Sequence, residues 1–211
     1  MKNFDLSLYL VLDPVLCADI GMVETARAAV AGGATIVQLR DKHASTAAMI
    51  ETGLALKQAL AGSNALLIVN DDVEAAIAIG ADGLHIGQED LDAGEARRRV
   101  GTEMILGLSV ETEALASAID ADVVDYVGVG PVFATPTKPD HKHPIGFDGL
   151  ARIIQLCPVP TVAIGGLKAE HAADALAAGA DGLAVVSAIC GKPDPEAATV
   201  LIADAIKEAR K

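Results

Sequence analysis

The sequence predicts an α/β barrel of eight parallel strands, and three observations carry that prediction. Short apolar runs alternate with Ala-rich stretches of helical spacing, which gives eight strand–helix pairs. The runs lack polar–apolar alternation, as is typical of parallel strands buried on both faces. Polar residues follow one run after another, where a barrel of this type keeps its active site. We therefore expect a single-domain (β/α)8 TIM barrel over residues 1–211, with an open doubly wound sheet as the alternative.

The expected elements follow in chain order. Strands are predicted at 6–12, 35–39, 65–69, 83–86, 104–108, 123–129, 160–164 and 183–187. Helices are predicted at 22–31, 45–61, 73–79, 92–99, 111–119, 147–155, 168–178 and 194–209. A weak repeat at 31–34, 79–82 and 178–181 places glycine at helix ends, where it adopts the left-handed conformation cheaply. The longest irregular segment, 131–146, follows the sixth strand and is expected to be a mobile active-site loop.

The composition limits the classes of partner. Apolar residues make up 52% of the chain but aromatic residues only 2%, so Ala, Val, Leu and Ile must fill the core. A net charge of −13 argues against nucleic acid and against an anionic membrane surface. The three cysteines form no CxxC pair, which favours a reducing cytoplasm over a disulfide framework or a zinc site. The expected partners are small molecules, and a homo-oligomer is left open.

Three cations follow the second and sixth strands. Arg40 and Lys42 stand at alternate positions, so both are expected to point to one side, and Lys138 adds a third charge. A diphosphate requires about this much positive charge to be held and to leave. The alternative is a solvated surface cluster with Asp41.

Two carboxylates, Asp71 and Asp90, follow neighbouring strands. Together with phosphate oxygens and water they would form a Mg²⁺ site. The alternative is helix capping, for which Asp72 and Asp92 are the better candidates. Asn70 and Ser109 are further donors at the same rim.

A second, neutral anion site is predicted after strands seven and eight, at Gly165-Gly166 and Ser187. Backbone N–H groups at helix N-termini point at an anion there, and glycine permits close approach. Two anion zones indicate one bis-phosphorylated substrate or two phosphorylated substrates that are joined. His85 is interpreted as a hydrogen-bonded structural histidine rather than a general acid or base.

Taken together, these pieces resemble the thiamine phosphate synthase family in order and over almost the whole chain. The matching segments are 37–42 (VQLRDK), 69–73 (VNDDV), 85–90 (HIGQED), 107–109 (GLS), 130–138 (GPVFATPTK), 163–166 (AIGG) and 185–187 (VVS). The resemblance implies an enzyme that couples hydroxymethylpyrimidine diphosphate to hydroxyethylthiazole phosphate. Its products are thiamine monophosphate and pyrophosphate, and it requires Mg²⁺.

The resemblance also implies residue roles. Asp71 and Asp90 would bind the metal, and Ser109 and Lys138 would contact the diphosphate. The pyrimidine diphosphate would be held by Gln38, Leu39, Arg40, Asp41, Lys42 and Asn70. The thiazole phosphate would be held by Thr135, Pro136, Thr137, Gly166, Val186 and Ser187. Arg40, Lys42, Ser109 and Lys138 would form the catalytic set.

Two other functions stay open at this point. A thiazole tautomerase is a related barrel that transfers a proton and would need an acid–base residue such as His85 but no diphosphate site. A non-catalytic binder of a phosphorylated intermediate would use the pocket of strands seven and eight alone, which would leave the cationic residues superfluous.

Overall fold

The computed structural model describes residues 2, 4–135, 137 and 142–211, and its strands close into a barrel in chain order. All eight strands are parallel, and β1 pairs with both β2 and β8. The strands are β1 (Leu8–Val11), β2 (Ile36–Leu39), β3 (Leu66–Asn70), β4 (Gly83–Ile86), β5 (Ile105–Val110), β6 (Tyr126–Val129), β7 (Thr161–Ile164) and β8 (Gly182–Val185). The predicted fold class is confirmed, and the open sheet is excluded.

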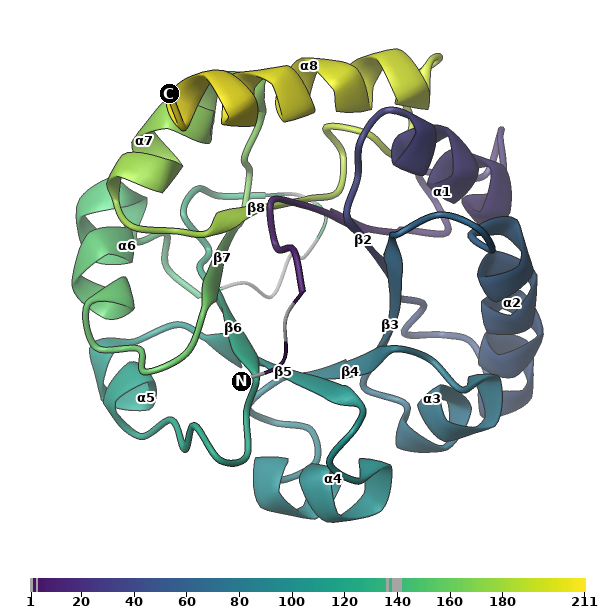
Figure 1. Ribbon diagram of the computed structural model, residues 1–211, viewed down its shortest axis with the longest axis horizontal. Helices are drawn as coiled ribbons and strands as arrows, with labels where there is room; N and C mark the ends of the chain where they lie inside the picture. The colour runs from purple at the N-terminus through teal and green to yellow at the C-terminus, as the bar shows by residue number, and fades with distance from the viewer. Residues whose placement is uncertain (1, 3, 136, 138–141) are drawn as a thin grey trace.

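Helices surround the barrel on its outer face (Figure 1). They are α1 (Met22–Ala31), α2 (Thr46–Ala59), α3 (Val73–Ile79), α4 (Ala93–Val100), α5 (Glu113–Ser117), α6 (Gly146–Ile154), the 3₁₀ turn η1 (Ala169–His171), α7 (Ala172–Ala177) and α8 (Pro195–Ala209). The predicted elements are all present, with shifted ends. The strand expected at 123–129 begins only at Tyr126, because the Val123 and Val124 N–H groups both donate to the Asp120 carbonyl in a turn.

The helix ends follow the predicted signals. Asp72 caps α3 by accepting the Ala75 N–H at 2.9 Å, and Asp92 caps α4 by accepting the Glu95 N–H at 3.0 Å. Gly80 ends α3 in the left-handed conformation at φ 60°. The capping roles of Asp72 and Asp92 are therefore confirmed. Asp71 and Asp90 are not needed for these two helix caps.

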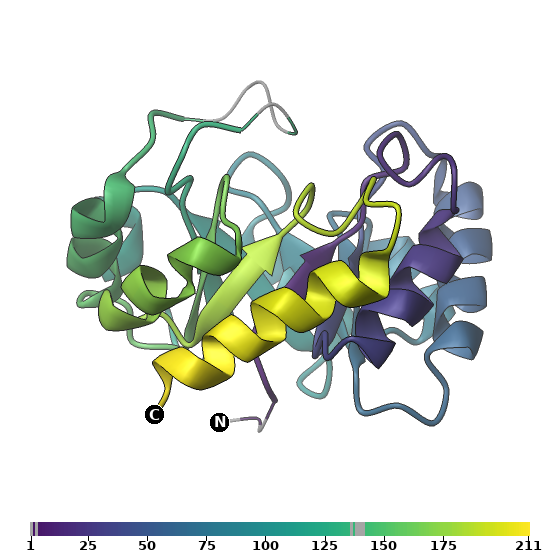
Figure 2. The same cartoon turned by 90° about the horizontal axis from the view of Figure 1, so that it is seen from above.

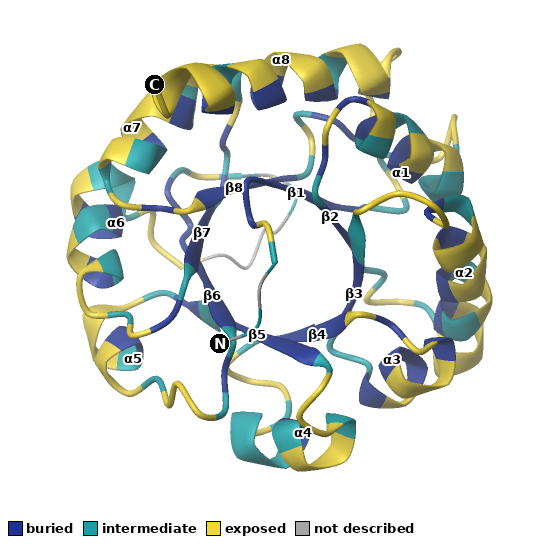
Figure 3. Cartoon of the chain, viewed as in Figure 1, coloured by how far each residue is buried: buried dark blue, intermediate teal, exposed yellow. Residues whose placement is uncertain are grey.

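The apolar residues form two layers. The outer layer lies between the strands and the inward faces of the helices, while the exposed helix faces point to solvent (Figure 3). The inner layer fills the barrel with side chains that include Tyr9, Ile36, Ile68, Tyr126 and Val162. The two tyrosines of the chain, Tyr9 and Tyr126, both belong to the inner layer.

The N-terminal segment covers one end of the barrel. Phe4 packs edge-on against Tyr126 with ring centroids 5.8 Å apart, and Lys2 forms an ion pair with Asp125 at 2.9 Å. Both termini lie at this end, and the segment after β6 extends from the opposite end (Figure 2). Within the described residues, each helix is too short or too polar to span a lipid bilayer.

Candidate active site

A cavity of about 540 Å³ opens at the C-terminal ends of the strands. Its lining comes from residues 9–187, which confirms that the strand ends meet at one rim. Twelve of the predicted site residues line it: Gln38, Arg40, Lys42, Asn70, Asp71, Asp90, Ser109, Thr135, Thr137, Gly166, Val186 and Ser187. The two predicted anion zones therefore belong to one cavity.

Two predicted site residues do not reach the cavity. Leu39 is fully buried in the layer between strands and helices, on the opposite face of β2 from Gln38. Asp41 accepts the N–H groups of His43 and Ala44 with its carboxylate, which fixes the turn after β2. Both follow from strand geometry, since alternate side chains point to opposite faces. Pro136 and Lys138 lie outside the described residues.

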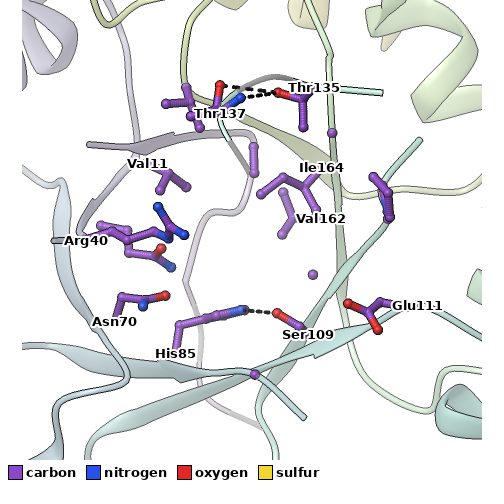
Figure 4. A pocket seen from close by; sticks show the side chains of 18 of the residues that line it. Val11, Arg40, Asn70, His85, Ser109, Glu111, Thr135, Thr137, Val162 and Ile164 are labelled. Carbon is purple, nitrogen blue, oxygen red and sulfur yellow. Dashed lines mark hydrogen bonds between the residues drawn. The ribbon is translucent and has the colours of Figure 1, made fainter. Parts of the chain in front are cut away.

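Arg40 points into the cavity from the β2 side (Figure 4). It is half-buried, and within the described part of the chain it makes no ion pair or hydrogen bond. Lys42 forms an ion pair with Asp71, with 3.5 Å between Nζ and Oδ2, and is more exposed than Arg40. A half-buried arginine that has no carboxylate partner among the described residues keeps its guanidinium donors available to an anionic ligand.

Asp71 occupies a strained position between β3 and α3. Its φ is +62°, the one left-handed non-glycine residue among those described, because the chain turns from Asn70 to the α3 cap within a single residue. The Asn70 amide donates to its carboxylate at 2.6 Å. This geometry points the carboxylate toward the cavity rather than along the helix.

Asp71 and Asp90 face each other closely enough to interact. Burial raises the pKa of Asp71 to about 6, the neighbouring Asp90 carboxylate adds to the rise, and Lys42 opposes it. The Gly87 N–H donates to Asp90 at 2.8 Å and holds that carboxylate in place. Two carboxylates brought together against their mutual repulsion fit a divalent cation, which would relieve it. No cluster of three or more His, Cys, Asp or Glu side chains that could hold a metal ion occurs among the described residues.

This pairing predicts a titration result. Asp90→Asn is expected to lower the pKa of Asp71 from about 6 toward its ordinary 3.8, and burial will keep it above that value. The measurement is a ¹³C NMR titration of the Asp71 carboxyl in metal-free protein. The matched control is Asp92→Asn, which removes the same charge at the α4 cap and should leave the titration unchanged. Equal titration curves for Asp90→Asn and the parent protein would disprove the pairing.

The predicted second anion zone lies where the segments after β6, β7 and β8 line the cavity. The N–H groups of Val132 and Phe133 donate to the carbonyls of Ile164 and Gly165, at 2.9 and 3.0 Å. These bonds bring Phe133 and Ala134 against Gly166, and Thr135 and Thr137 line the same cavity. A side chain at Gly166 has no room, because a Cβ there would lie 2.9 Å from the Phe133 Cβ and 3.0 Å from the Ala134 carbonyl oxygen.

Ser187 lies where the sequence placed it, between β8 and α8. The backbone N–H groups that were expected to point at an anion there do not belong to α8, because that helix begins only at Pro195. A single turn closed by the Cys190 N–H and the Val186 carbonyl, at 2.8 Å, follows β8 instead. The Ser187 N–H lies in the first position of that turn and has no acceptor among the described residues. It is thus available to an anion, as the helix terminus would have been.

His85 is hydrogen-bonded inside the barrel, as interpreted from the sequence. Its Nδ1 lies 3.0 Å from the Tyr126 hydroxyl. Its Nε2 lies 3.0 Å from Ser109 Oγ (Figure 4). Sequence reasoning missed three residues of this region, Tyr9, Tyr126 and Glu111. Glu111 points into the cavity near Ser109. Tyr9 and Tyr126 are the chain's two tyrosines. The signal that could have identified them is the presence of a hydroxyl group within an otherwise apolar strand.

Comparison with known proteins identifies the family of this chain. Residues 8–189 match the family model described as thiamine monophosphate synthase. A thiamine-phosphate synthase from a Psychrobacter species is 50% identical over 202 residues, covering 94% of both chains, and that of Xanthobacter autotrophicus is 50% identical over 209 residues, covering 99% of both. The solved thiamine phosphate pyrophosphorylase from Pyrococcus furiosus superimposes with a TM-score of 0.88 at 36% identity over 98% of both chains. A 3-hexulose-6-phosphate synthase structure, at 19% identity and a TM-score of 0.69, shares the fold alone. The chain belongs to the thiamine monophosphate synthase family.

Proposed function

We propose that this protein is a thiamine-phosphate synthase. It joins hydroxymethylpyrimidine diphosphate to hydroxyethylthiazole phosphate and releases pyrophosphate. The observation that carries the proposal is the single cavity, which presents a cationic, carboxylate-rich zone and a neutral, backbone-lined zone to the same space. A reaction between a diphosphate ester and a monophosphate ester requires both zones at once. We assign the reaction to one catalytic domain over residues 1–211 and to the cytoplasm, where free thiols such as its three cysteines persist.

The residue roles divide between the zones. We assign the pyrimidine diphosphate to Gln38, Arg40, Lys42, Asn70, Ser109 and Lys138. We assign the thiazole phosphate to Thr135, Pro136, Thr137, Gly166, Val186 and Ser187. Lys138 and Pro136 enter from the family motif in the sequence, because they lie outside the described residues.

Asp71 and Asp90 would hold the Mg²⁺. When bound, the ion would neutralise charge on the diphosphate and make it a better leaving group. The raised pKa of Asp71 and the facing Asp90 carboxylate support this assignment.

The chain's own residues suit a dissociative reaction. Arg40 and Lys42 stabilise the negative charge that grows on the departing diphosphate, and Ser109 donates a hydrogen bond to it. The aminopyrimidine ring stabilises the methylene cation left behind, and the thiazole nitrogen then attacks that cation. This nitrogen carries no proton, so the attacking step needs no general base. The remaining task is alignment of the two rings, which the shared cavity supports.

The proposal is tested by mixing both substrates with purified protein and Mg²⁺, oxidising the products, and measuring thiochrome fluorescence. Thiamine monophosphate and pyrophosphate are expected in equal amounts with metal, and neither after chelation. Isomerisation of a carboxylated thiazole phosphate without pyrophosphate release would instead indicate a tautomerase. Binding of thiazole phosphate without turnover would indicate a carrier.

Gly166→Val is expected to raise KM for the thiazole phosphate by about tenfold or more, because the side chain displaces Phe133 and blocks the phosphate. KM for the pyrimidine diphosphate should change little. Steady-state kinetics with each substrate varied in turn measure both values.

The matched control for this variant is Gly62→Val. Gly62 also has a positive φ, at 84°, but a Cβ there meets no atom within 4 Å, and it does not line the cavity. The Gly62→Val substitution imposes backbone strain comparable to that of Gly166→Val and should leave both KM values unchanged. An unaltered KM for thiazole phosphate in Gly166→Val would remove Gly166 from the binding site.

A further inference from the structure

A continuous line of hydrogen bonds crosses the barrel beneath the cavity. Gln38 Nε2 donates to the Tyr9 hydroxyl at 2.7 Å, and the hydroxyls of Tyr9 and Tyr126 lie 2.8 Å apart. The Tyr126 hydroxyl meets His85 Nδ1 at 3.0 Å, and His85 Nε2 meets Ser109 Oγ at 3.0 Å. We call these five residues the Gln38–Ser109 chain. It joins strands β2, β1, β6, β4 and β5, and both of its ends line the cavity.

The two phenols in the middle of this chain are shielded from solvent. Tyr9 and Tyr126 are almost fully buried, in the apolar layer that fills the barrel. Burial is the main cause that raises the pKa of both phenols, so each hydroxyl keeps its proton. The Tyr126 ring is accommodated by Gly107, since a Cβ at Gly107 would lie 2.2 Å from the Tyr126 Cζ. The fold therefore reserves space for two hydroxyls in a place where polar groups are costly unless paired.

With the Gln38 amide nitrogen directed at Tyr9, the protons of the chain have only one arrangement that satisfies every group. An amide nitrogen only donates, so the Tyr9 oxygen accepts from Gln38 and its single proton goes to Tyr126. Among the described residues, the Tyr126 hydroxyl meets only Tyr9 and His85, so its proton goes to His85 Nδ1. That nitrogen must then be bare, and the imidazole proton must be on Nε2, which donates to Ser109 Oγ.

We propose that the Gln38–Ser109 chain fixes His85 in the Nε2–H tautomer and so turns the Ser109 hydroxyl proton into the cavity. Ser109 Oγ has no other partner among the described residues, so its proton is directed to a ligand. His85, Tyr126 and Tyr9 are then positioning residues for the donor that meets the diphosphate. This inference rests on the proposed function for the identity of that ligand.

The tautomer of His85 matters because a serine hydroxyl can either donate or accept a hydrogen bond. With the opposite tautomer, Ser109 would donate to His85 and present only lone pairs to the cavity, where they would repel an oxyanion. With the proposed tautomer, the donor is aligned before the leaving group develops its charge, and no reorientation is needed during reaction. The same line of bonds also fixes Gln38 on the far side of the cavity.

The tautomer is tested directly, without substrates, by ¹⁵N NMR of the histidine rings. The chain has five histidines, and the His85 signals are those lost in His85→Gln. We expect the Nδ1 of His85 to show the shift of a bare nitrogen and the Nε2 that of a protonated one. In Tyr126→Phe the donor to Nδ1 is gone, and the Nδ1–H form is expected to become populated. A protonated Nδ1 in the parent protein, on either a neutral or a charged ring, would overturn the proposal whatever the protein catalyses.

The consequence for turnover is tested by a matched pair of variants. The amide nitrogen of glutamine reaches the position of His Nε2, whereas that of asparagine reaches the position of Nδ1. His85→Gln keeps a donor to Ser109 and should retain kcat within about tenfold, whereas His85→Asn should lose about 100-fold. KM for the thiazole phosphate and the melting temperature should be alike in the two variants. Equal losses of kcat, or the reverse order, would contradict the proposed role.

A double-mutant cycle separates this role from general packing. In a Ser109→Ala background there is no hydroxyl to orient, so the difference in kcat between His85→Gln and His85→Asn should disappear. Persistence of that difference would show that His85 acts on turnover by another route.

Discussion

Asp71→Asn is expected to reduce kcat/KM for the pyrimidine diphosphate by about 1,000-fold at fixed Mg²⁺, while thiazole phosphate still binds. Asparagine is the substitution of choice because position 71 has φ +62°, which asparagine tolerates almost as well as aspartate. The loss then reports the missing charge rather than backbone strain. Pyrophosphate release measures the reaction, and calorimetry measures thiazole phosphate binding. Asp90→Asn is expected to behave alike.

The neighbouring cap residues provide the controls. Asp72→Asn removes the same charge one position away and preserves the α3 cap, since asparagine caps helices as well as aspartate. Asp92→Asn does the same beside Asp90 at α4. Both controls should keep nearly full activity. Normal turnover in Asp71→Asn and Asp90→Asn would contradict the metal assignment. An equal loss of turnover in Asp72→Asn and Asp92→Asn would contradict it as well.

The stability of Asp71→Asn separates function from folding. The pKa of Asp71 is about 6 in the folded protein and close to 4 when unfolded, so the folded state binds this proton more tightly. Its contribution to stability is therefore full below about pH 4 and is lost as the pH rises through 6. At pH 8 the parent protein carries this penalty and the variant does not. We expect Asp71→Asn to unfold at an equal or higher urea concentration at pH 8, and a lower midpoint would show a structural role instead.

The barrel could be predicted because each of its elements carries a local signal. The run Leu66–Asn70 is apolar on both faces and ends in polar residues, and Asp72 starts the next helix. Gly80 then ends that helix in a conformation that other residues avoid. Since the same order recurs around the chain, closure into a ring was the simplest solution. The ends of the strands were less predictable, because hydrophobicity alone does not distinguish Val123 and Val124 in a turn from residues in β6.

The site was predictable where side-chain direction follows from strand geometry. Gln38, Arg40 and Lys42 share one face after β2, whereas Leu39 and Asp41 between them turn away, as the period of a strand requires. All five residues belong to the family motif. The direction in which each side chain points therefore decides which of them reach the cavity. The Gln38–Ser109 chain was not predictable, because it depends on which strands become neighbours across the barrel interior. Tyr9 and Tyr126 are 117 positions apart in the sequence and meet only after closure.

Arg40→Gln is expected to reduce kcat/KM for the pyrimidine diphosphate by about 100-fold or more, with KM for thiazole phosphate nearly unchanged. Arg40 has no carboxylate partner in the described part of the chain, so its charge is fully available to the diphosphate. Lys42 cannot replace it, because it is more exposed and already lies 3.5 Å from Asp71. Arg40→Lys keeps the charge but loses the planar fork that binds two phosphate oxygens, and should fall between the parent protein and Arg40→Gln.

The control for charge alone is Arg27→Gln. Arg27 pairs with Glu24 on the exposed face of α1, and it does not line the cavity. It alters the net charge of the protein by the same amount, so any general effect on attraction of anions appears in both variants. Kinetics at low and at 0.5 M salt provide the decisive comparison, since long-range attraction is screened at high salt whereas a direct contact in the cavity persists. The Arg40→Gln defect should remain at high salt. The proposed contact is contradicted if the kcat/KM defect of Arg40→Gln disappears at 0.5 M salt, or if Arg27→Gln shows an equal defect. Arg40 would then attract the substrate only at long range, and other residues would have to stabilise the charge on the leaving group.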